Sequence, residues 1–266
     1  MKNRTLLIVI LIACSVRAQA QQAQQSQKPG ERKNFLSCPV VQDTKTVPCW
    51  LSEYRGELYY LGIQTDISAD FHPPYLGHKV LVEGVVSDEP RICGGVVLKP
   101  VVVSPILEPD SSCNTILPAV DKYTVPFAPR PPGPSGGTLA FQAPPQRPAP
   151  LQPPFMPREF SIYYDFDMTV MGKHAGLLTQ IVDYAENSEA KRVIVTSVRG
   201  STLLSDGVVL NEKQGIAQAR AAEIADLLKR AGLSKTTIQV TSSEELKPAS
   251  GVEDWKSRRT TVRVEP

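Results

Sequence analysis

A proline-rich stretch, residues 126–157, divides this 266-residue chain into two candidate folding units. It holds half of the chain's 24 prolines. Proline removes backbone hydrogen-bond donors and favours the extended polyproline II conformation, so the stretch predicts a semi-rigid linker and not a domain. At about 3.1 Å per residue, such a linker spans several tens of Å. The two units on either side are residues 35–125 and 158–266.

The first 20 residues have the pattern of an export signal. A short basic segment precedes an apolar run too short to span a bilayer comfortably, and Ala18-Gln19-Ala20 fits a signal-peptidase site. A competing interpretation is a lipobox at Leu11-Ile12-Ala13-Cys14, which would leave a lipid anchor on Cys14. Both interpretations predict export, to the periplasm or to the cell outer membrane. Residues 21–34 are polar and rich in glutamine, which predicts a disordered tether.

The charge balance argues against a nucleic-acid partner. Loss of the leader removes Lys2, Arg4 and Arg17, so the 29 basic residues fall to 26 against 27 acidic residues. A nucleic-acid-binding domain would instead show a strongly basic face.

Four cysteines remain after the leader, all in the first folding unit: Cys38, Cys49, Cys93 and Cys113. An even number of cysteines in an exported chain predicts two disulfides, and four cysteines allow three pairings. The sequence has no Cys-x-x-Cys pair, so zinc is the weaker interpretation of these cysteines. We predict no metal and no other cofactor.

Residues 35–125 have a β-rich pattern. Short runs of alternating or β-branched residues are separated by glycine and proline turns, at Glu57–Gln64, His78–Ser87 and Gly95–Ser104. The pattern around Lys79–Gly84 resembles the middle of a small OB-like barrel. Two other interpretations stay open beside a plain β core: a metal site at Asp66, Asp70, His72 and His78, and an aromatic binding face.

Residues 158–266 predict a two-layer α/β sandwich with the order βαβαββ. The expected strands are Phe160–Asp167, Arg192–Val198, Thr236–Ser243 and Thr260–Glu265, and the expected helices are residues 171–188 and Asn211–Ala231. The second helix carries an apolar stripe, with Arg220 at its edge between Ile216 and Ile224. A guanidinium in that position needs a negative partner, because burying an unpaired charge is costly. The partner is either an acid of the chain, such as Asp206 or Glu223, or an anionic ligand.

The order of these elements, the Tyr-Tyr-Asp-Phe-Asp strand, the helix containing Arg220-Ala221 and the end Ser257-Arg258-Arg259 resemble the OmpA-like peptidoglycan-binding domain. The resemblance covers about two fifths of the chain. In that family, a loop aspartate and the helix arginine hold diaminopimelate of the wall peptide. The resemblance therefore implies Arg220 as a ligand-binding residue, with Arg258 and Arg259 as residues that support the site.

The loop departs from the family pattern. Where the family has Gly-His-Thr-Asp, this chain has Ser197-Val198-Arg199-Gly200, so that Gly200 stands in place of the aspartate. The connection that follows is longer than usual and contains Asp206, which we predict as the second ligand residue. The alternative for Asp206 is a simple turn, since Asp206-Gly207 is a strong turn dipeptide.

These features predict a non-enzymatic protein of the cell envelope. Its C-terminal domain would contact peptidoglycan, and its N-terminal domain would bind another envelope component, such as an outer-membrane or secretion-system protein. The alternative is a protein–protein adaptor whose OmpA-like domain no longer binds peptidoglycan. A periplasmic enzyme is a minor alternative, since the sequence has no Gly-x-Ser-x-Gly, no His-Glu-x-x-His and no phosphate loop.

Overall fold

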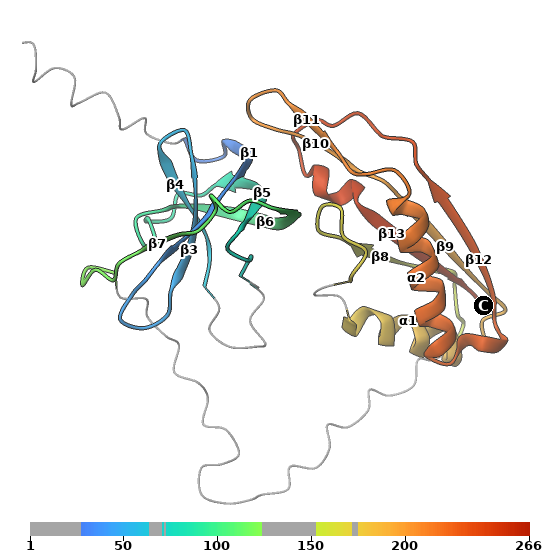
Figure 1. Ribbon diagram of the computed structural model, residues 1–266. Coiled ribbons are helices and arrows are strands. Elements are labelled where there is room, and N and C mark those ends of the chain that lie inside the picture. The colour runs from blue at the N-terminus through green and yellow to red at the C-terminus, as the bar shows by residue number, and fades with distance from the viewer. Residues whose placement is uncertain (1–27, 64–70, 72, 124–152, 172–174) are drawn as a thin grey trace, which may run out of the picture.

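The computed structural model describes residues 28–63, 71, 73–123, 153–171 and 175–266. These residues form an N-terminal β domain and a C-terminal α/β domain (Figure 1). The predicted leader and lipobox lie outside the described residues, as do residues 21–27 of the predicted tether, residues 126–152 of the predicted linker, and Asp66, Asp70 and His72. The prediction of a disordered tether is wrong for its last residues, because residues 32–34 belong to the first strand of the N-terminal domain. No helix within the described residues has the length and apolar character needed to cross a membrane.

The N-terminal domain is a strongly curved sheet with the strand order β1-β5-β6-β4-β3-β2-β7. Its strands are β1 (Arg32–Ser37), β2 (Pro39–Gln42), β3 (Cys49–Tyr54), β4 (Glu57–Gly62), β5 (His78–Val86), β6 (Val96–Pro109) and β7 (Thr115–Leu117). Only Cys38 separates β1 from β2, yet these two strands lie near opposite ends of the order. The first stretch of chain therefore bends and closes the sheet into a barrel, and Ser37 Oγ donates to the carbonyl of Glu53 across the seam between β1 and β3.

Two cores lie on opposite faces of the barrel sheet. Side chains from alternate positions, such as Val80 and Val82 of β5, fill the inside of the barrel. A second core covers the outside of β2, β3 and β4, where Leu51 and Cys49 pack with Leu117 and Tyr123 from the end of the domain. The disulfides Cys38–Cys113 and Cys49–Cys93 hold this outer layer to the barrel. The prediction of two disulfides is thereby confirmed, and the structure selects one of the three pairings.

The C-terminal domain has two layers, as predicted. Its strands are β8 (Arg158–Tyr163), β9 (Arg192–Val198), β12 (Thr237–Ser243) and β13 (Arg259–Glu265), in the order β12-β9-β13-β8. The helices α1 (Ala175–Asn187) and α2 (Ile216–Arg230) both cover one face of this sheet. Alternate residues such as Val193 and Val195 form the core with the apolar stripes of the helices, while the opposite face of the sheet carries Thr196 and Thr241 toward solvent.

Two differences from the predicted elements affect the site. The long connection after β9 forms a hairpin of β10 (Ser201–Leu203) and β11 (Val209–Asn211), where the sequence predicts a loop. Helix α2 begins at Ile216 and not at Asn211, because Gly215 has a φ of 88° in the left-handed region that favours glycine. Glu212 therefore lies outside the helix, between the hairpin and the first turn of α2.

The two domains meet through the outer face of β5. Alternation along this strand points Leu81 and Glu83 away from the barrel interior. Leu81 packs with Phe166 and Leu204 of the C-terminal domain. Glu83 is 4% exposed and forms an ion pair with Arg258, and its Oε1 accepts a hydrogen bond from Thr202 at 3.1 Å. The interface thus has an apolar part and a buried ionic part.

Candidate functional site

Arg220 lies on the buried side of α2, in the same stripe as Ala217, Ala221 and Ile224. Its side chain is 0% exposed. An arginine is rarely buried to this degree unless its charge is paired, because moving an unpaired ion out of water costs on the order of several kcal/mol. The sequence predicts Arg220 at the edge of the apolar stripe, whereas the structure places it fully buried within the stripe.

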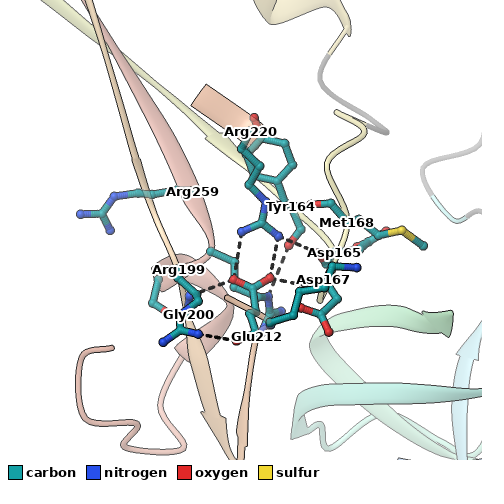
Figure 2. Close-up of polar contacts among 12 residues, drawn as sticks. Tyr164, Asp165, Asp167, Met168, Arg199, Gly200, Glu212, Arg220 and Arg259 are labelled. Carbon is teal, nitrogen blue, oxygen red and sulfur yellow. Dashed lines mark hydrogen bonds and ion pairs between the residues drawn. The ribbon is translucent and has the colours of Figure 1, made fainter. Parts of the chain in front are cut away.

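Glu212 is that partner. Arg220 Nη1 donates to Glu212 Oε2 at 2.9 Å, and Nη2 donates to Oε1 at 2.6 Å. The Glu212 side chain is also 0% exposed. The backbone N–H groups of Gly200 and Asp167 donate to the same carboxylate, at 2.8 and 3.0 Å (Figure 2). Each carboxylate oxygen thus accepts one bond from the guanidinium and one from the backbone, which fills about four acceptor positions.

The remaining groups of the guanidinium are held by the chain that follows β8. Nε donates to the carbonyl of Met168 at 2.7 Å, and Nη2 donates to the carbonyl of Asp165 at 3.3 Å. The guanidinium carbon lies 4.5 Å from the centre of the Tyr164 ring, a cation–π distance. Burial raises the pKa of Tyr164, so its ring stays neutral beneath the cation. The guanidinium of Arg220 is enclosed on all these sides by the protein itself.

A second acid occupies the start of α2. Gly215 provides no side-chain cap, but Glu244, from the loop after β12, accepts bonds from the N–H groups of Gly215 at 3.0 Å and Gln218 at 3.2 Å. Arg199 Nε lies 3.6 Å from the same carboxylate. The positive end of a helix is a natural position for an anion. Here a side chain of the chain occupies that position.

The structure does not bring the other predicted site residues to Arg220. Asp206 is exposed in the turn between β10 and β11, where its Oδ1 accepts a bond from the N–H of Val208 at 3.1 Å. This is the turn that the sequence analysis gave as the alternative. Glu223, the other acid suggested for an internal pair, lies 3.8 Å from Arg230 on the exposed side of α2. The internal partner is Glu212 and neither of these acids.

Arg258 and Arg259 face different ways. Arg258 is 0% exposed and belongs to the domain interface, where Nη2 is paired with Glu83 and Nη1 donates to Thr202 at 2.8 Å. Arg259 is half-buried, donates to the carbonyl of Lys256 at 3.0 Å and lies apart from the Arg220–Glu212 pair in Figure 2. Neither side chain contacts Arg220 through any hydrogen bond recorded for the described residues.

Sequence reasoning missed Glu212, Glu83 and Glu244. A helix from Asn211 would place Glu212 about two turns from Arg220, roughly 12 Å along the axis, which is too far for an ion pair. Gly215 in the sequence was the available signal that α2 begins later. Glu83 and Arg258 lie in different domains, so the sequence around each residue contains no pattern that predicts their contact.

A cleft of about 400 Å³ lies between the two domains. Its walls come from the barrel, including Tyr75 and Val103, and from the C-terminal domain, including Tyr163, Met168 and Trp255. Among the described residues of this lining, Asp165 is the single ionisable acid or base apart from tyrosine. No group of three or more His, Cys, Asp or Glu side chains that could hold a metal occurs in the described part of the chain. His78 in particular bonds through Nδ1 to the carbonyl of Ile106 at 2.8 Å.

No protein-family model and no curated protein sequence matches the chain. Among solved structures, the chain is similar to a MotB-like protein from Desulfovibrio vulgaris, with 11% identity and a TM-score of 0.33 over 41% of this chain and 75% of that one. It is also similar to the OmpA-like domain of FopA1 from Francisella tularensis, with 15% identity and a TM-score of 0.32 over 41% of this chain and 73% of that one. At such scores the two structures carry no functional argument, and the resemblance rests on the residues quoted above.

Proposed function

We propose that this protein is a non-enzymatic adaptor of the cell envelope, in which an OmpA-like domain no longer binds a wall-peptide carboxylate at Arg220. The observation that carries this proposal is the carboxylate of Glu212, which makes both bonds that a ligand carboxylate would make with the guanidinium. A ligand would have to displace a buried acid that also accepts two backbone bonds. Such a displacement leaves a charge without its partners and is strongly unfavourable.

The second acid supports the same function. Glu244 satisfies the first N–H groups of α2, so the helix end is not free for an anion either. The two positions in this region that favour a negative group are both filled by glutamates of the chain. Peptidoglycan contact, the function that the family resemblance implies, would then need a surface other than the one around Arg220.

The architecture of the N-terminal domain limits where a partner could bind. We propose that it is an OB-type barrel. Its first stretch of chain, β1 and β2 with only Cys38 between them, lies at both ends of the sheet order, and β4 runs parallel to β6. The face of such barrels that usually binds ligands is the outside of the second and third strands. When β1 and β2 are counted together as the first strand, the second and third strands are β3 and β4. The outer core, which the two disulfides hold to the barrel, covers them. A partner of this domain would therefore bind elsewhere on the barrel.

An enzyme fits less well. The cleft between the domains is lined mainly by apolar and aromatic side chains, whereas a catalytic site needs several converging titratable groups. Apolar walls with tyrosine, tryptophan and methionine are typical of surfaces that contact protein.

Cosedimentation with purified peptidoglycan sacculi tests the proposal. We expect the wild-type chain to stay in the supernatant while an established peptidoglycan-binding OmpA-like protein sediments. The matched variant is Glu212→Gln with Arg220→Met, which removes both charges together and avoids leaving one of them buried and unpaired. Retention of the wild type that disappears in this folded double variant would refute the proposal, because it would show that Arg220 binds the wall. Equal retention of both proteins would place wall binding on another surface.

A further inference from the structure

The strand β12 forms one edge of the C-terminal sheet and lacks the features that usually protect such an edge. It pairs only with β9, and the described chain adds no strand beyond it (Figure 1). Its seven residues, Thr-Ile-Gln-Val-Thr-Ser-Ser, include no charge and no proline. Edge strands are normally kept short, charged or interrupted by proline, because their free backbone groups pair with other strands. By contrast, β7 has three residues and the edge strand β8 begins with Arg158 and Glu159.

The backbone groups that face outward on β12 follow from its pairing with β9. The N–H of Thr237 donates to Lys191, and the carbonyl of Ser243 accepts from Arg199. Residues at odd positions from 237 to 243 therefore direct their N–H and C=O groups toward β9. The outward N–H and C=O groups are those of Ile238, Val240 and Ser242.

The centre of this edge also exposes an apolar side chain. Val240 is 48% exposed, although it lies opposite Val195, which is part of the core. Ile238, two residues earlier on the same face, packs against the core and is half-buried. The apolar surface of the core thus continues to the free edge at Val240, where a further strand would cover it.

The charges that flank β12 have opposite signs at its two ends. Lys235 is exposed just before the strand, and Glu245 is exposed just after it. In the described part of the chain, neither side chain has an ion-pair partner. The other acid at this end, Glu244, is already used at the start of α2.

We propose that β12 pairs antiparallel with β12 of a second copy of this chain, about a twofold axis at Val240. This register places Ile238 opposite Ser242 of the second copy and Val240 opposite its counterpart. These are the residues whose backbone groups point outward, so each of the three pairs exchanges two hydrogen bonds, six in all. The same register brings Lys235, the last residue of the 3₁₀ helix Leu233–Lys235, to the same end of the seam as Glu245 of the second copy, and it covers Val240 with its counterpart.

The pairing joins the two four-stranded sheets into one continuous sheet with both α2 helices on the same face. An isologous contact of this kind closes on itself and gives a dimer and not a fibre. The proposal is independent of the function proposed above, since neither Arg220 nor the barrel takes part in it.

Sedimentation equilibrium of the full disulfide-bonded chain, from roughly 1 to 200 µM, tests the pairing. We expect a reversible monomer–dimer equilibrium. Val240→Pro should be monomeric, because it removes an outward N–H group that no bond within the sheet uses. Val240→Lys should also be monomeric, because it brings two like charges together at the axis. Circular dichroism of both variants should match the wild type.

Charge exchange tests the register. Lys235→Glu and Glu245→Lys should each raise the dimer dissociation constant roughly three- to tenfold, since each affects two exposed ion pairs. The double variant, which carries both exchanges, should return to the wild-type value. A wild-type chain that remains monomeric throughout, a dimer that persists in both Val240 variants, or a double variant as weak as the single ones would each overturn the proposal.

Discussion

Removing the charge of Glu212 should destabilise the C-terminal domain more than any surface substitution. In Glu212→Gln the buried guanidinium of Arg220 loses its counter-charge while the shape of the side chain is kept. Breaking a buried ion pair by removing one partner costs about 3–5 kcal/mol. The substitution also replaces one carboxylate oxygen, an acceptor, with an NH₂ donor. That NH₂ would face two N–H groups that now donate to the carboxylate, one from Arg220 and one from the backbone of Gly200 or Asp167. We therefore expect a loss near the upper end of that range.

Urea and thermal unfolding followed by circular dichroism measure this loss. For a folded chain of this size, about 3–5 kcal/mol corresponds to a fall in Tm of roughly 6–20 °C. Asp206→Asn is the matched control, because it neutralises an exposed acid in the neighbouring hairpin and keeps the oxygen that accepts from Val208. The control should lie within about 0.5 kcal/mol of the wild type.

A double-mutant cycle separates the ion pair from other effects of the substitution. Glu212→Gln combined with Arg220→Met should lose less stability than the two single changes added together, by about 1–3 kcal/mol. A Glu212→Gln variant whose free energy of unfolding lies within about 1 kcal/mol of the wild-type value would refute the closed ion pair, because a buried unpaired guanidinium destabilises the fold by more than that.

Three further predictions concern other parts of the molecule. Glu83→Gln should weaken the contact between the domains, because Arg258 loses its counter-charge. We expect chemical unfolding in one transition for the wild type and in two for this variant. Glu244→Ala should lower stability by about 1 kcal/mol, the usual cost of a lost helix cap, and this is measurable by urea unfolding beside the exposed control Asp206→Asn. Burial raises the pKa of Tyr59 to about 12, above the unfolded value of about 10. The folded state therefore holds this proton more tightly, and stability should fall as pH rises from about 10 to about 12; Tyr59→Phe should reduce that fall, and an unchanged pH profile would contradict the assignment.

Local patterns in the sequence predicted most of the elements. The strand Arg192–Val198 was predicted with the bounds it has in the structure, because β-branched residues and alternation act within a few residues. The same local pattern predicts the apolar stripe of α2, although it places Arg220 at the edge of the stripe and not within it. Elements that depend on one residue's backbone conformation were harder, and the early start assigned to α2 ignored the positive φ of Gly215. That error of a few residues concealed the partner of Arg220.

Contacts between distant segments could not be predicted from these patterns. Glu83 and Arg258 are separated by 175 residues, and each looks like an ordinary charged residue of its own segment. The choice among the three disulfide pairings could not be predicted for the same reason, since it depends on how the barrel closes and not on the spacing of the cysteines. Long-range polar contacts of this kind leave no periodic signal in either partner.

Gly200 lies against the domain interface, beside Arg258. A Cβ atom at this position would lie 2.5 Å from Arg258 Cγ and 2.5 Å from Ser257 Oγ, far inside contact distance. An aspartate here would therefore collide with the arginine that anchors the barrel. Glycine at this loop thus leaves room for the side chain that pairs with Glu83, and a larger residue here would disturb the docking of one domain on the other as well as the loop itself.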